Sequence, residues 1–105
     1  MTDQPGNSSL QAQFRQAYLF HQNGKLTEAK SGYERIIIED PEHFNALHFL
    51  GLIYFQLGAI VKSIGLITRA IGINPEDASA YVNRGISLMR LTKAQLHDRD
   101  FARAA

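Results

Sequence analysis

Histidine is the residue type in this chain that could bind a metal ion or move protons near neutral pH. The four histidines, His21, His43, His48 and His97, are too dispersed to match a zinc-binding motif. The 105-residue chain has no cysteine, so thiolate ligands, disulfide bonds and cysteine nucleophiles are excluded. We therefore expect no metal site and no cofactor.

Carboxylate and hydroxyl groups show no catalytic arrangement either. The acidic pairs Glu39–Asp40 and Glu76–Asp77 flank expected helix starts, where negative charge stabilises the positive end of a helix. No serine lies in a Gly-x-Ser-x-Gly turn, and no glycine-rich loop could cradle a phosphate. The sequence therefore predicts a protein that is not an enzyme and has no catalytic residues.

Charge and hydropathy argue against two further classes. Eleven basic and ten acidic residues give a net charge of +1, and both signs are scattered, so neither nucleic acid nor an anionic membrane is expected as a partner. The most apolar stretch, residues 59–73, contains Lys62 and Arg69 and is too short to cross a bilayer. The N-terminus lacks the pattern of a signal peptide. We expect a soluble protein without membrane insertion, with the cytoplasm as its default compartment.

Apolar residues recur at helical spacing along the chain, and glycine and proline separate the runs. Gly24 is expected to close a helix, since glycine readily adopts the left-handed conformation. The pairs Asp40–Pro41 and Asn74–Pro75 are expected to start helices, each with its first residue as the N-cap and its proline at the first helical position. No segment alternates as a half-buried strand would, so an all-helical chain of five or six helices is predicted.

These glycines and prolines recur at one spacing. Pro41 and Pro75 are 34 residues apart, and Gly24 and Gly58 are separated by the same number. A 34-residue repeat of paired helices is typical of the tetratricopeptide repeat, and the chain resembles that family. In the middle repeat, the family pattern falls on Leu47, Leu50, Gly51, Tyr54, Gly58, Ser63, Ile67, Ala70 and Pro75.

The resemblance implies an all-α, right-handed superhelix of antiparallel helix pairs. Residues 1–8 are expected to be a flexible leader and residues 9–105 the repeat domain. The repeats are expected at about 10–43, 44–77 and 78–105. Because one helix pair cannot bury its apolar face alone, the repeats are expected to stack.

The third repeat departs from the pattern of the other two. Thr92 stands where Gly24 and Gly58 stand, and His97 takes a position that Ala29 and Ser63 occupy. Three alternatives follow: an atypical terminal repeat that acts as a polar cap, a fragment of a longer solenoid, or a fusion of helices five and six. A fused helix would free an apolar surface for exchange between two copies.

In the tetratricopeptide family, the first helices of successive repeats line a concave groove. Carried over to this chain, the groove positions are Gln11, Phe14, Arg15, Tyr18, His21, Gln22, Asn45, His48, Phe49, Leu52, Phe55, Gln56, Ser79, Val82, Asn83, Ile86, Met89 and Arg90. The favoured peptide contacts among them are Phe14, Tyr18, His21, His48, Leu52, Phe55, Val82, Ile86, Met89 and Arg90. Relatives that hold chaperone C-termini use Lys and Asn at groove positions where this chain has Phe14, Tyr18 and Ser79, so that carboxylate clamp is missing.

The function that the resemblance implies is a non-catalytic interaction module whose groove binds an apolar or amphipathic peptide or helix of a protein partner. One alternative is the N-terminal repeat part of a larger bacterial enzyme of glycosyltransferase type. Another is a self-associating scaffold, a homodimer or higher homo-oligomer, with helix exchange through the third repeat. A second candidate for self-association is a stripe of small or apolar residues in the middle repeat: Val61, Gly65, Thr68 and Gly72.

Overall fold

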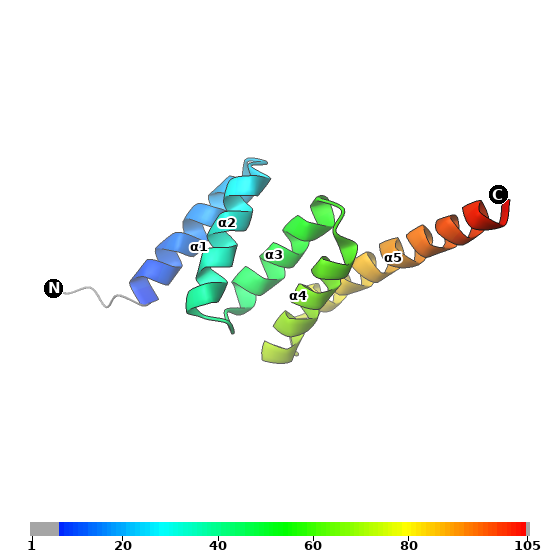
Figure 1. Cartoon of the computed structure of the whole chain (residues 1–105). Helices are drawn as coiled ribbons and strands as arrows, with labels where there is room; N and C mark the ends of the chain where they lie inside the picture. The colour runs from blue at the N-terminus through cyan, green and yellow to red at the C-terminus, as the bar shows by residue number, and fades with distance from the viewer. Residues whose placement is uncertain (1–6, 105) are drawn as a thin grey trace.

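The computed structural model describes residues 7–104, which form five helices and no strand. The helices are α1 (Asn7–Gln22), α2 (Leu26–Glu39), α3 (Phe44–Gln56), α4 (Ile60–Ile73) and α5 (Ala78–Ala104). Helices α1 and α2 form one hairpin, α3 and α4 form a second, and α5 packs against the second hairpin (Figure 1). The prediction of an all-α chain is confirmed. Helix α1 begins inside the expected leader, and residues 1–6 lie outside the described part of the chain.

Helices α3 and α5 start later than the sequence predicts. Asp40 and Asn74 each accept a hydrogen bond from the backbone N–H two residues on, at 3.1 and 3.3 Å. Each therefore closes an Asx turn with the proline that follows, and the prediction of N-caps at these residues is wrong. The caps are His43 and Asp77, which accept from the backbone N–H three residues on, both at 3.1 Å. The residue before a proline is disfavoured in helical backbone geometry, so the chain turns at Asp40 and Asn74. The next helix begins only after this turn is complete.

Two glycines end the first helices of the first two repeats as predicted. Gly24 has φ +77° and Gly58 has φ +86°, both in the left-handed region that other residues avoid. Thr92, the equivalent residue of the third repeat, stays helical, and its hydroxyl donates to the carbonyl oxygen of Leu88 at 3.0 Å. Helix α5 therefore runs through this position without a turn, which is the fused-helix alternative.

Close packing inside the second hairpin depends on Gly51. A Cβ at this position would lie 2.7 Å from Cγ1 of Ile67 and 3.3 Å from the carbonyl oxygen of Ser63, so only glycine allows α3 and α4 to approach so closely. One buried cluster joins α1, α2 and α3: Ala17, Ala29, Tyr33, Ile36, Ala46, Leu50 and Ile53. A second joins α4 and α5: Ile67, Ile71 and Ala80. The core therefore runs along the stack, and the molecule measures 67 × 29 × 20 Å.

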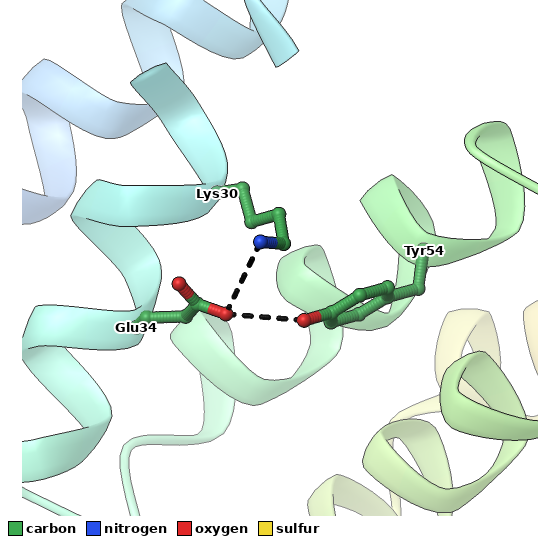
Figure 2. A network of polar contacts seen from close by, with 3 residues as sticks. All are labelled: Lys30, Glu34 and Tyr54. Atoms are coloured by element: carbon green, nitrogen blue, oxygen red, sulfur yellow. Dashed lines mark hydrogen bonds and ion pairs between the residues drawn. The ribbon is translucent and has the colours of Figure 1, made fainter. Parts of the chain in front are cut away.

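A polar network connects the first repeat to the second (Figure 2). The hydroxyl of Tyr54 on α3 donates to Oε2 of Glu34 on α2 at 3.0 Å. Nζ of Lys30 lies 3.6 Å from the same oxygen and 5.7 Å from the centre of the Tyr54 ring. Burial, followed by the hydrogen bond to Glu34, raises the pKa of Tyr54. Tyr54 therefore stays protonated and keeps donating across the repeat boundary.

Candidate functional site

Phe49 lies at the centre of an aromatic cluster on the face formed by the first helices. Its ring centre is 5.8 Å from that of Phe14 and 5.5 Å from that of Tyr18, both on α1. It also stacks against the buried ring of Tyr33 on α2, with the ring centres 6.1 Å apart. The sequence predicts a groove position for Phe49 but does not place it among the favoured contacts. The structure shows that its ring contacts aromatic rings of both α1 and α2.

Successive first helices touch through residues that are 35 positions apart. The four contacts are Phe14 with Phe49 (ring centres 5.8 Å), His21 with Gln56 (2.8 Å hydrogen bond), His48 with Asn83 (2.9 Å hydrogen bond), and Phe55 with Arg90 (guanidinium carbon 4.7 Å from the ring centre). Equivalent positions of successive repeats are 34 residues apart, whereas the residues in contact across these helices are offset by one residue more. The extra residue follows from how neighbouring first helices pack, and the sequence period alone does not give it.

His48 is buried where α3 meets α5. Its side chain is 5% exposed, and its Nε2 accepts a hydrogen bond from the amide nitrogen of Asn83 on α5. Burial lowers the pKa of His48, opposed in part by the negative charge of Asp77. Because the amide nitrogen can only donate, the imidazole must be neutral at Nε2 for this bond to exist. The structure thus places His48, a favoured peptide contact, beneath the surface.

Two hollows follow the row of first helices. One, of about 340 Å³, is lined by His21, Leu52, Phe55, Gln56, Asn83, Ile86 and Ser87, from α1, α3 and α5. The other, of about 480 Å³, lies between α1 and the start of α3 and is lined by Gln11, Phe14, Arg15, His43 and Asn45. The first hollow brings together four favoured contacts, and Phe14 borders the second.

The remaining favoured contacts line neither of these two hollows. Tyr18 is partly exposed beside Phe49. Met89 and Arg90 border a further hollow along α5, of about 520 Å³, which also reaches Leu96. Val82 is exposed on α5 and lines none of these hollows.

The second candidate surface, the stripe Val61, Gly65, Thr68 and Gly72, is exposed along α4. A Cβ added at Gly65 or Gly72 would meet nothing within 4 Å, so packing within one chain does not require glycine there. Gly65 borders a hollow of about 580 Å³ between α2 and α4, lined mainly by apolar side chains. Thr68 accepts a hydrogen bond from the guanidinium of Arg84 on α5 at 3.4 Å.

Among residues 9–99, whose side chains the structure describes, no three histidine or acidic side chains gather as metal ligands would. Among residues 7–104, no helix is both long enough and apolar enough to span a bilayer. Burial is the chief cause of the shifted pKa values of His48 and Tyr33, lowering the first and raising the second. The row of first helices presents an exposed surface of apolar and aromatic side chains together with polar ones.

No protein-family model matches the chain, and no curated protein matches it by sequence. Solved structures do match. A mutant of the Thermobaculum terrenum O-GlcNAc transferase aligns with a TM-score of 0.79 at 24% identity, over 83% of this chain and 17% of that one. This chain therefore corresponds to a small part of that enzyme.

Two domains of similar size also match. The second TPR of Spaghetti (RPAP3), bound to the HSP90 peptide SRMEEVD, has a TM-score of 0.76 at 20% identity, over 89% of this chain and 86% of that one. The first TPR of the same protein, bound to the same peptide, has a TM-score of 0.76 at 21% identity, over 90% and 75% of the two chains. At such identities the likeness is one of fold.

Proposed function

From the tetratricopeptide-repeat fold of this chain, we propose that it is a protein-interaction module whose groove binds an apolar or amphipathic peptide or helix without chemistry. The observation that carries the proposal is the hollow between α1, α3 and α5. Its walls include the apolar side chains of Leu52, Phe55 and Ile86, with His21 and Asn83 as polar groups at its edges.

The exposure of the hollow favours apolar anchors on the partner. Ile86 is 46% exposed at its rim, and Phe55 is half-buried with its face against Arg90. An apolar side chain that becomes fully buried contributes about 1.5–3 kcal/mol, so two or three anchors support a stable complex. A helix would present such anchors at i, i+4 and i+7 spacing.

An acidic chain terminus is a less suitable occupant than an apolar segment. Both Spaghetti domains hold the acidic HSP90 peptide SRMEEVD. In this chain, the groove positions that grip a terminal carboxylate in chaperone receptors carry the uncharged residues Phe14, Tyr18 and Ser79. Phe14 and Tyr18 instead pack on Phe49. We therefore propose recognition through apolar contacts.

The experiment is a selection from a random peptide display library on the immobilised chain, followed by fluorescence anisotropy with a selected peptide. Ile86→Arg should weaken binding at least about tenfold, a loss of about 1.4 kcal/mol, because it places a charge at the rim of the hollow. The matched control is Val61→Arg on α4, where the side chain is 69% exposed outside the groove. Enrichment of no peptide, or weakening by the control variant alone, would contradict the proposal.

A second candidate is that the chain forms the repeat part of a larger enzyme of glycosyltransferase type. The observation that favours it is the match to the O-GlcNAc transferase, 17% of which the chain covers. An antibody against the chain tests this candidate on extracts of the source cells. A native product much larger than 11.8 kDa supports it, and a product of that mass removes it.

A further inference from the structure

We propose that α5 pairs in antiparallel fashion with α5 of a second copy of this chain. The contact residues form one line along the helix, called here the α5 seam: Val82, Gly85, Met89, Thr92, Leu96 and Arg99. The proposal goes beyond peptide binding, and it assigns two favoured groove residues, Val82 and Met89, to an interface between copies.

The outer half of α5 extends away from the body of the molecule (Figure 1). Every side chain described from Thr92 to Arg99 is exposed. Isolated helices of this length are marginal in water, because the hydrogen bonds of a short helix barely offset its ordering. Even so, this segment exposes Leu96 by 50%, and Met89, one turn before it begins, by 71%. A packing partner would account for a long helix with an apolar side.

The spacing along the seam is that of a coiled coil. Its members follow one another by three, four, three, four and three residues, the interval at which side chains stay on one face of two paired helices. The apolar members are Val82, Met89 and Leu96, seven residues apart, and Gly85, Thr92 and Arg99 alternate with them. The opposite face of α5 already packs on the body of the molecule, where Ala80 and Ser87 are buried. The seam is thus the side of the helix that stays available to a partner.

The seam is complementary to itself when two copies run in opposite directions. One register, with the two-fold axis between Arg90 and Leu91, sets Leu96 opposite Gly85 and Met89 opposite Thr92. Each large side chain then meets a small residue, and each pairing occurs twice, as an isologous interface requires. Gly85 is open to receive Leu96, since a Cβ built there meets nothing within 4 Å.

The charges at the two ends of α5 suit the same register. Arg99 would lie beside Val82 of the second copy, five residues along the helix from Asp77. Asp77 caps the start of α5, where the positive end of its dipole lies, and hydrogen bonds from Ser79 and the Ala80 backbone lower its pKa. Asp77 is therefore negative at neutral pH and would attract the basic group near the end of the partner helix.

Thr92 contributes to the pairing by keeping α5 continuous. Its equivalents Gly24 and Gly58 close helices with positive φ, whereas Thr92 remains helical. The part of α5 after Thr92 therefore does not fold back onto its own chain, and its seam residues remain available to a second copy. A fold-back within one chain, or a different protein on the seam, are the competing occupants that the experiments below separate.

The first experiment measures mass in solution by sedimentation equilibrium over a wide range of concentrations. The chain should shift from one to two chain masses as concentration rises, and Leu96→Arg should remain at one. Ala94→Arg is the matched control, because it adds the same charge to the same exposed turn on the opposite side of α5 from the seam, and it should still form dimers. One chain mass for the unmodified protein at every concentration would overturn the proposal.

The second experiment identifies the register and uses the absence of native cysteine. A Gly85→Cys chain is mixed with a tagged Leu96→Cys chain under mild oxidation, and a disulfide between the two is expected. Replacing Leu96→Cys by Ala94→Cys should abolish the mixed product. A disulfide formed only inside one chain that carries both Gly85→Cys and Leu96→Cys would show fold-back and refute pairing. Neither variant lines the hollow between α1, α3 and α5, so peptide binding is tested independently.

Discussion

At the residue scale, His48 and Asn83 join α3 to α5 by a hydrogen bond that requires a neutral imidazole. Burial lowers the pKa of His48 from its ordinary 6.5, while in the unfolded chain the group keeps that ordinary value. The unfolded state therefore binds the proton more readily. The stability that His48 contributes is fully present above pH 6.5 and is lost as pH falls toward the lowered folded-state pKa.

The urea midpoint of the chain should therefore fall as pH is lowered from above to below 6.5, and His48→Gln should flatten this dependence. His97→Gln is the control: His97 is exposed on α5, and this substitution should leave the curve unchanged. Asp77 acts in a separate window, because its pKa is depressed below the ordinary 3.8. A pH profile that is identical with and without His48 would refute this role.

The link between the first two repeats gives a second prediction at this scale. Tyr54→Phe removes the hydroxyl that donates to Glu34 at 3.0 Å and leaves the ring in place. The group is partly exposed, so the free energy of unfolding should fall by only about 0.5–1 kcal/mol, as measured by urea titration. A loss of several kcal/mol would mean that Tyr54 has another role in packing.

Individual side-chain roles were the part of the fold least visible in the sequence. Asp before Pro is typical of helix starts and predicts a cap at Asp40, yet Asp40 closes an Asx turn and His43 makes the cap. Both arrangements satisfy the same kinds of backbone donor, and only the path of the chain between the helices decides between them. His48 likewise has the spacing of a groove residue, but its burial depends on how closely α5 approaches.

At the element scale, glycine determines where helices end and how closely they pack. Gly51→Ala would place a Cβ 2.7 Å from the buried side chain of Ile67, and an overpacked core typically loses about 1–3 kcal/mol. Gly65→Ala is the matched control on α4, where the new Cβ meets nothing within 4 Å. That variant should gain up to about 1 kcal/mol from helix propensity. The urea midpoints of the two variants should therefore shift in opposite directions, down for Gly51→Ala and up for Gly65→Ala.

Thr92 tests whether one residue sets the length of α5. Thr92→Gly restores the residue that has positive φ at Gly24 and Gly58, and it lowers helix propensity by roughly 0.5 kcal/mol or less. Amide hydrogen exchange of residues 93–99 should accelerate in this variant, while protection in α1 to α4 is unchanged. Thr92→Ala, which keeps a good helix former, should retain the protection of α5. Equal exchange in both variants would show that other residues define this helix.

At the scale of the whole molecule, the 34-residue period predicts the stack because Gly24, Gly58 and the prolines repeat with it. The all-α repeat architecture could therefore be predicted from the sequence. So could the arrangement of the first helices of successive repeats along one face of the molecule. The continuous α5 was predictable only as one of three alternatives. Helix α5 is continuous because Thr92 does not end it as Gly24 and Gly58 end α1 and α3. The absence of a helix-ending residue constrains a structure less than its presence does. The contacts across the groove were hidden until the displacement of 35 residues between first helices was known.

The most direct test of the peptide-binding account is a titration of the isotope-labelled chain with a display-selected peptide, followed by NMR. We predict the largest amide shift changes in α1, α3 and α5 around the hollow that Leu52, Phe55 and Ile86 line. Changes confined to α2 and α4, around the hollow that Gly65 and Ile38 border, would contradict the account.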